Sequence, residues 1–211
     1  MTALSLPIEL AKIDAFSTWL TTVAKRPIIA ACRNKPGDRL RFNVAHELGH
    51  LVLHGELKRL RPGEHQQADR FAAELLMPGA AMRKEIEPPV TLSRVAPLKP
   101  RWGASVQALI RRAHDLGIIA NRQYRYLFEQ LSAKGWRTNE PSNLAVEQER
   151  PRALRKMAEI VYGNPMDYGR FSSDARLSVF YLKDLMDGYA EAPPLATEAM
   201  PTGKVIQLRS G

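Results

Sequence analysis

Residues 43–55 read Asn-Val-Ala-His-Glu-Leu-Gly-His-Leu-Val-Leu-His-Gly and decide the fold of this 211-residue chain. Within them, His46, Glu47 and His50 form the pattern H-E-x-x-H. Side chains four positions apart share one face of a helix, about 6 Å apart along its axis, so both imidazoles can bind one metal ion. Glu47 follows the first histidine and can reach water at that ion without binding the metal. The stretch therefore predicts a helix with a zinc site of the kind found in hydrolases.

The flanking residues favour the same helix. Asn43 is expected to be its N-cap and Gly55 to end it. Histidines on an apolar face are often buried core residues, but four of the five histidines lie between 46 and 65, which favours a metal site. His54 is expected to be structural, because it would lie about 12 Å from His46 along a straight helix.

A catalytic zinc ion usually has three protein ligands and a fourth position for water. The second helix expected, at 64–77, carries an apolar stripe that includes Ala68, and His65 lies one turn before that residue. His65 is favoured as the third ligand because Asp69, four residues further on, could fix the tautomer of a ligand histidine. Glu64 is the alternative ligand.

The overall composition indicates one globular core with a helical annex. Hydrophobic residues make up 45% and charged residues 25%, and no apolar run approaches the ~20 residues needed to cross a bilayer. The N-terminus lacks the pattern of a secretion signal and Cys32 is the only cysteine, so we expect a cytoplasmic protein without membrane contact. The net charge of +9 permits contact with DNA or an acidic partner.

Other segments predict the surrounding elements. We expect a helix, or a loop and a helix, within 7–24, and a strand at 28–32 that could be an edge strand holding a substrate. Short helices are expected at 93–98, from Ser105 to His114 and from Asn121 to Lys134. These three short helices with tight turns resemble a helix-turn-helix unit, so residues 105–134 could contact DNA, or the unit could be an annex packed on the core. Two further helices are expected at 150–163 and 173–189.

Two stretches carry a family resemblance: residues 41–54, Arg-Phe-Asn-Val-Ala-His-Glu-Leu-Gly-His-Leu-Val-Leu-His, and residues 67–78, Gln-Ala-Asp-Arg-Phe-Ala-Ala-Glu-Leu-Leu-Met-Pro. The similarity continues at 98–103, 108–113 and 135–137. With these motifs in this order, the sequence resembles the ImmA/IrrE metallo-endopeptidases, a family of bacterial and phage gluzincin-like enzymes.

The resemblance implies an α+β, mostly helical fold, with a zincin-like metallopeptidase core, a small sheet and the H-E-x-x-H helix, followed by a helix-turn-helix-like annex. It implies a cytoplasmic zinc protease that cleaves a helix-turn-helix (XRE-type) repressor and so releases stress-response, mobile-element or toxin–antitoxin genes. We expect the chain to divide into a peptidase domain at 1–87, the helix-turn-helix-like region at 88–140, C-terminal helices at 141–190 and a flexible tail at 191–211.

Residue by residue, His46 and His50 match the family's ligand histidines, Glu47 its catalytic glutamate and Asp69 the Asn or Asp of its second helix. The family's third ligand is usually a glutamate, and the corresponding position here is His65. A site of three histidines would carry one more unit of positive charge. Two other hypotheses are a non-proteolytic regulator that binds a repressor or DNA around a structural metal, and a zinc hydrolase acting on a different substrate.

Overall fold

The computed structural model describes residues 2–6, 14–20, 26–32, 35–55, 61–149 and 152–187. The fold is α+β and mostly helical, as predicted. The described residues up to 149 and those from 152 onward form two compact units, each described by itself. The first unit contains a three-stranded sheet, seven α-helices and a short 3-10 helix among its described residues.

The sheet has the order β1-β3-β2, made from Thr2–Leu6, Arg26–Cys32 and Ala15–Leu20. β3 pairs parallel with β1 and antiparallel with β2. The strand expected at 28–32 is confirmed, but its expected place at an edge is wrong because it is paired on both sides. The helix expected within 7–24 is also wrong over β2, where aromatic and β-branched residues pair with β3. Its remaining residues, 7–13 and 21–24, lie outside the described ones.

Helix α1, Gly37–Leu53, carries the H-E-x-x-H pattern and is longer than expected. It begins after Pro36, so Asn43 lies inside the helix and is not its N-cap. The segment 146–147 packs closely on this start, because Gly37 has no Cβ atom, which would come within 2.5 Å of its backbone. The predicted end is confirmed, since Gly55 has a φ of +63° directly after the cap residue His54.

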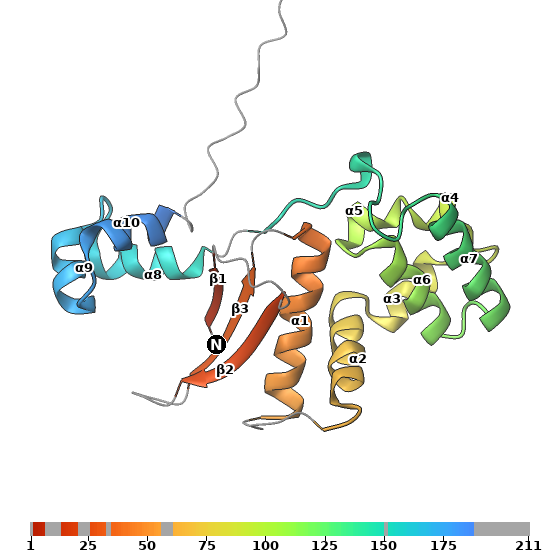
Figure 1. Cartoon of the computed structure of the whole chain (residues 1–211), viewed down its shortest axis with the longest axis horizontal. Coiled ribbons are helices and arrows are strands. Elements are labelled where there is room, and N and C mark those ends of the chain that lie inside the picture. The colour runs from red at the N-terminus through yellow and green to blue at the C-terminus, as the bar shows by residue number, and fades with distance from the viewer. Residues whose placement is uncertain are drawn as a thin grey trace, which may run out of the picture. The chain divides into compact units, whose positions relative to one another are not determined.

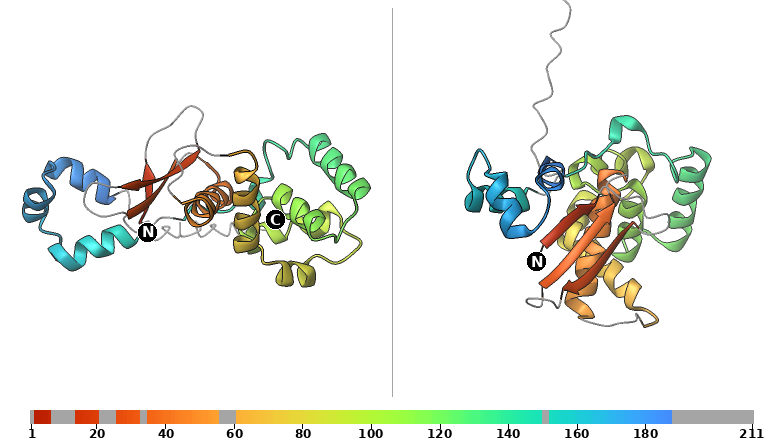
Figure 2. Two further views of the ribbon diagram at one scale, coloured as in Figure 1. Left: turned by 90° about the horizontal axis from the view of Figure 1, so that it is seen from below. Right: turned by 60° about the vertical axis from the view of Figure 1, so that its left-hand side comes forward.

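Helix α2, Glu64–Leu76, packs along α1 on the side away from the sheet (Figures 1 and 2). The contact is close because small residues form it: Gly49 meets Ala68, which is fully buried. A Cβ at Gly49 would lie 3.1 Å from the Ala68 Cα and from the Phe71 ring. The glycine inside the H-E-x-x-H pattern thus sets the distance between the two helices.

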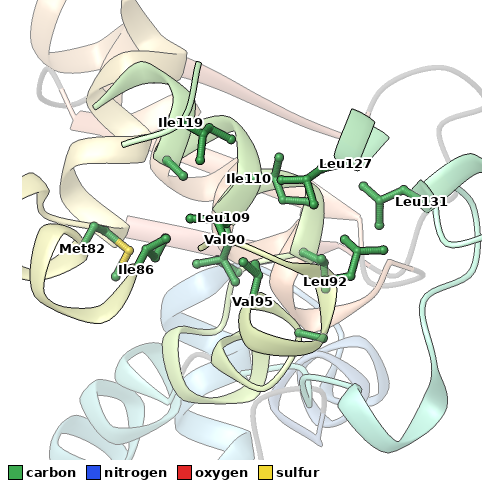
Figure 3. Packing of buried hydrophobic residues seen from close by; sticks show 14 of the residues in the cluster. Met82, Ile86, Val90, Leu92, Val95, Leu109, Ile110, Ile119, Leu127 and Leu131 are labelled. Carbon is green, nitrogen blue, oxygen red and sulfur yellow. The ribbon is translucent and has the colours of Figure 1, made fainter. Parts of the chain in front are cut away.

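The rest of the first unit is helical: α3 Gly79–Glu85, α4 Leu92–Val95, α5 Leu98–Trp102, α6 Val106–Asp115, α7 Asn121–Ala133 and the 3-10 helix Ser142–Leu144. Its core joins side chains from α3 to α7 (Figure 3), among them Met82, Val95, Leu109, Ile110, Leu127 and Leu131. The helix expected from Ser105 to His114 is present as α6, and Ser105 is its N-cap, because its hydroxyl accepts from the Ala108 amide. The helix expected from Asn121 is present as α7, with Ala120 as its N-cap.

The second unit contains α8, Ala153–Tyr162, α9, Tyr168–Ala175, and α10, Val179–Asp187. One helix was expected at 173–189, but the chain breaks it at Arg176, which has a φ of +54°. The tail expected at 191–211 lies outside the described residues. None of the helices in the described ranges has both the length and the apolar character needed to span a bilayer.

Candidate metal centre

Three imidazoles converge where α1 packs against α2. The Nε2 atoms of His46 and His50 lie 3.0 Å apart, and Nδ1 of His65 lies 3.3 and 3.2 Å from them, respectively. Four residues separate the two histidines of α1, so they share one face, and the close helix contact brings the first turn of α2 to that face. We call His46, His50 and His65 the histidine cluster.

The spacing of this cluster fits a bound metal ion. Nitrogen ligands at 2.0–2.1 Å from a tetrahedral metal ion lie about 3.3–3.4 Å apart, close to the observed separations. Burial lowers the pKa of His50, and the neighbouring imidazoles His46 and His65 lower it further, which favours the neutral form that binds metals. When all three rings are neutral, the nitrogens that face one another cannot all form good hydrogen bonds among themselves. One metal cation, in contrast, can bind the lone pairs of all three.

Asp69 holds the outer nitrogen of His46. Its Oδ1 lies 2.8 Å from His46 Nδ1. This hydrogen bond is the main reason why the pKa of Asp69 lies below its ordinary value. The sequence placed this carboxylate beside His65, one turn away on the same helix, but in the structure its partner is on α1. The bond fixes the tautomer of His46, with the proton on Nδ1 and the lone pair of Nε2 directed at the cluster.

His50 has a different outer partner, which the sequence analysis did not assign. His50 Nδ1 lies 2.9 Å from His54 Nδ1, and His54 Nε2 lies 3.0 Å from Gln67 Oε1. A metal at His50 Nε2 requires the proton on Nδ1, so neutral His54 accepts there and donates from Nε2 to the Gln67 carbonyl. The spacing of four residues between His50 and His54 was a sequence signal for this contact. The role of His54 was predicted only from its distance to His46.

Glu47, the residue after the first histidine, is held from the sheet. The Ser17 hydroxyl on β2 donates to Glu47 Oε2 at 2.6 Å. This contact fixes the orientation of the carboxylate, and Oε1 has no side-chain partner among the described residues. Sequence reasoning missed Ser17 because residues 7–24 were expected to be helical, and no motif marks this serine.

The positions of His65 and Glu64 show which of these two alternatives can be the third ligand. His65 belongs to the cluster, whose ligand atoms lie within 4.8 Å of one another. The Glu64 carboxylate accepts instead from the Arg61 amide at 2.6 Å, at the start of α2. Helix geometry explains the difference, since adjacent residues point about 100° apart around the axis.

Comparison with known proteins agrees with this geometry. A search of the curated proteins finds no match to the chain. A peptidase family, M78, described as the IrrE N-terminal-like domain, matches residues 1–114, which include the whole histidine cluster. This match covers more than half of the sequence. The chain therefore belongs to the IrrE N-terminal-like family of peptidases.

Proposed function

We propose that the protein is a zinc-dependent endopeptidase whose substrate is a helix-turn-helix (XRE-type) repressor. The observation that carries the proposal is the convergence of three imidazole nitrogens at 3.0–3.3 Å beside a carboxylate that Ser17 orients. Nitrogen ligands in a tetrahedral arrangement suit zinc. Cleavage would remove the repressor and release stress-response, mobile-element or toxin–antitoxin genes.

The ligand count favours catalysis over a purely structural metal. Structural zinc sites are usually closed by four protein ligands, and catalytic sites have three. Within the described part of the chain, the cluster offers three ligand atoms. The exposed position of His65 supports access of a substrate from one side. A set of three protein ligands therefore weighs against the non-proteolytic regulator with a structural metal.

Each residue around the metal centre would perform one part of peptide hydrolysis. A bound zinc ion would supply Lewis acidity, which lowers the pKa of water and polarises the carbonyl of the scissile bond. Glu47 takes the proton of the attacking water on its free oxygen and then delivers it to the leaving amine. Asp69 and the pair His54–Gln67 hold the rings of His46 and His50 in the tautomers that bind metal.

The position of β2 supports a way to hold the substrate. β2 pairs with β3 on one side, and no described strand pairs with its other side. Ser17 places this strand within hydrogen-bonding distance of Glu47. An extended substrate segment can therefore add to the sheet along β2, with its scissile bond near the histidine cluster. β2 thus replaces β3 as the candidate substrate strand.

Changing Glu47 to Gln tests the proposal. The amide cannot accept the proton, so we expect cleavage to fall by about 10²–10⁴-fold while zinc content stays at the level of the unchanged protein. Cleavage is measured on purified helix-turn-helix repressors that are encoded in the same genome, and on fluorescein-labelled casein. Repressor release that survives the substitution would contradict the peptidase proposal and favour a binding function.

A contact with DNA through residues 105–134 stays a prediction. Arg122 and Arg125 of α7 are exposed, and their guanidinium groups have no ion pair among the described residues. Retention on duplex DNA that weakens with salt, and is lost when both become Ala, would support such a contact.

A further inference from the structure

Strand β2 contacts the metal-binding helix at two points. The hydroxyl of Ser17 donates to Glu47, inside α1. The indole Nε1 of Trp19 donates to the carbonyl of Gly55 at 3.1 Å, just after α1 ends. Successive side chains of a strand point to opposite faces, so Ser17 and Trp19 lie on the face of the sheet that contacts α1, and Phe16 lies on the other face. Trp19 therefore lies at the C-terminal end of the helix that carries two residues of the histidine cluster.

The backbone of Ser17 and Trp19 faces the outer edge of the sheet. The amide of Cys32 donates to the carbonyl of Asp14 at 2.9 Å, where β3 begins to pair with this strand. Bonded and non-bonded pairs alternate along antiparallel strands, so every second residue from Asp14 onward bonds β3, and the residues between them, which include Ser17 and Trp19, direct their N–H and C=O groups outward. Pro27, which has no N–H, lies opposite Trp19 and fits a pair without such bonds. Both residues can therefore bond an added strand through the backbone.

This pairing sets the positions of substrate residues along β2. In an antiparallel segment that adds to the strand, one residue lies opposite Ser17 and another, two positions along, lies opposite Trp19. Side chains of residues directly opposite each other share one face, with their Cβ atoms about 4.5–5.5 Å apart. The residue opposite Ser17 lies next to Glu47, so the cleaved bond adjoins it. The side chain of the residue opposite Trp19 contacts the indole.

The indole of Trp19 offers that substrate residue a fixed apolar surface. Its one hydrogen-bond donor, Nε1, is already bonded to the carbonyl of Gly55, which holds the ring at the end of α1. Trp19 is half-buried, so part of its surface is accessible. A polar side chain opposite the ring would lose water without gaining a hydrogen bond, whereas aromatic and large apolar side chains pair well with an aromatic ring across strands.

We propose that Trp19 selects a large apolar or aromatic side chain in the substrate, two residues from the one that pairs with Ser17. The inference rests on the proposed peptidase function and on the addition of the substrate along β2. It defines the substrate class as extended segments with such a side chain no more than about three residues from the cleaved bond. Because Trp19 contacts the substrate away from the reacting bond, it acts on binding and not on the chemical step.

The test measures peptide binding to the zinc-loaded Glu47→Gln protein, so that cleavage does not interfere. The probe is a short fluorescein-labelled peptide of serine and threonine with one central phenylalanine, compared with the same peptide with alanine at that position. We expect the phenylalanine peptide to bind about fivefold more tightly, the upper end of the effect of one cross-strand aromatic pair. Adding Trp19→Ala should abolish this difference. Adding Trp19→Phe should retain most of it, because an aromatic ring remains although the bond to Gly55 is lost.

Phe16→Ala is the matched control, because it removes an aromatic side chain from the same strand but from the opposite face. It should leave the ratio of the two peptide affinities unchanged, and equal zinc content in all variants shows that the metal centre is intact. Equal affinities for the two peptides in the Glu47→Gln protein would overturn the inference. So would a preference that survives Trp19→Ala, or one that Phe16→Ala abolishes to the same extent.

A second measurement locates the cut. The phenylalanine peptide is incubated with the zinc-loaded protein that retains Glu47, and mass spectrometry identifies the products. A cut within about three residues of the phenylalanine is expected, and a cut further away would overturn the inference. A peptide that binds with the preference set by Trp19 but is never cut would contradict the peptidase proposal and leave the preference itself standing, so the two failures are distinguishable.

Discussion

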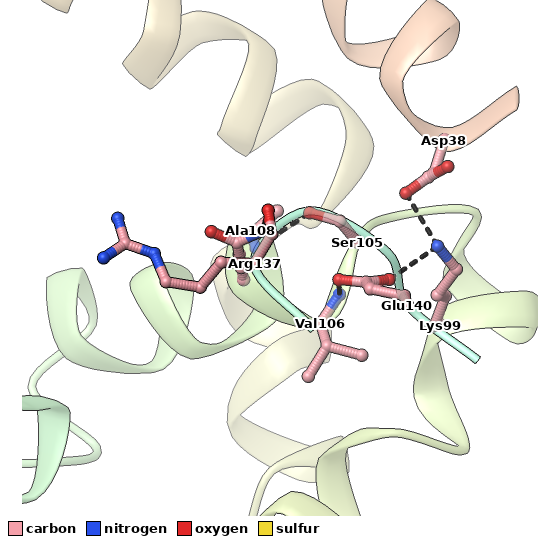
Figure 4. Close-up of polar contacts among 8 residues, drawn as sticks. Asp38, Lys99, Ser105, Val106, Ala108, Arg137 and Glu140 are labelled. Atoms are coloured by element: carbon pink, nitrogen blue, oxygen red, sulfur yellow. Dashed lines mark hydrogen bonds and ion pairs between the residues drawn. The ribbon is translucent and has the colours of Figure 1, made fainter. Parts of the chain in front are cut away.

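The histidine cluster and the group Asp38, Lys99 and Glu140, here called the buried triad, both include residues of α1, yet they handle charge differently. In the buried triad, Lys99 Nζ lies 2.9 Å from Asp38 Oδ2 and 2.6 Å from Glu140 Oε2 (Figure 4). The second oxygen of Glu140 accepts from the Val106 amide at 3.0 Å. One lysine therefore bridges two carboxylates of opposite charge to its own.

The histidine cluster brings like groups together. Its three inner nitrogens lie 3.0–3.3 Å apart, and the one carboxylate that contacts it binds the outer side of His46. The buried triad ties α1 to α5 and to the segment after α7, whereas the three nitrogens of the cluster are spaced to bind one metal ion. Close ionisable groups thus serve the fold when their charges are complementary, and they indicate a ligand when they are alike.

The largest effect is expected from removing one ligand of the cluster. His65→Ala leaves two imidazoles, so zinc affinity should fall by more than the roughly 10–100-fold typical of losing an outer partner. Glu64→Gln is the matched control on the neighbouring residue and should keep zinc, because Glu64 contacts the Arg61 amide. Zinc competition with a chromogenic chelator measures both. Undiminished affinity in His65→Ala would transfer the third-ligand role to another residue.

Breaking the buried triad should affect stability rather than metal binding. Lys99→Met leaves two carboxylates without their cation, so the free energy of unfolding should fall by about 3–5 kcal/mol. Arg101→Met, which removes the exposed pair with Glu85, should cost no more than about 1 kcal/mol. Urea denaturation measures both changes. Equal losses in the two variants would show that the triad contributes no more than a surface pair.

The triad also makes stability depend on pH. Burial alone would lower the pKa of Lys99, but the bonds from Glu140 and Asp38 outweigh it and raise that pKa. Because the folded pKa is above the unfolded one, the stabilisation is complete below about pH 10.4 and is lost as pH rises through the folded value. The difference in unfolding free energy between the unchanged protein and Lys99→Met should therefore shrink only above about pH 10.

The outer partners of the cluster should have an intermediate effect. In His54→Ala, the His50 Nδ1 proton loses its acceptor, so zinc affinity should fall by about 10–100-fold. Gln67→Leu removes the next acceptor in the same chain of hydrogen bonds and should have a smaller effect in the same direction. His114→Ala, in α6, is the control that should leave zinc affinity unchanged. An unchanged affinity in His54→Ala would mean that the His50 ring is held by packing alone.

The contrast between the two groups also explains what the sequence could predict. The α1 histidines are four residues apart, so helix periodicity alone places them on one face, and His65 follows from the same rule applied to α2. The buried triad joins residues 61 and 41 positions apart. No local pattern encodes such a contact, because it depends on how α5 and the segment after α7 fold back. Ser17 was missed for the same reason, since its contact with Glu47 joins residues 30 positions apart.

The smallest effect is expected at the link between the sheet and the cluster. Ser17→Ala removes the hydroxyl that donates to Glu47 Oε2 at 2.6 Å, so the carboxylate can rotate away from the attacking water. We expect kcat on fluorescein-labelled casein to fall about three- to tenfold, the loss of roughly one hydrogen bond, with KM and zinc content unchanged. Thr18→Ala is the matched control, because successive side chains on β2 point to opposite faces. A kcat that stays constant, or rises, in Ser17→Ala would show that this bond does not hold Glu47 in its catalytic orientation.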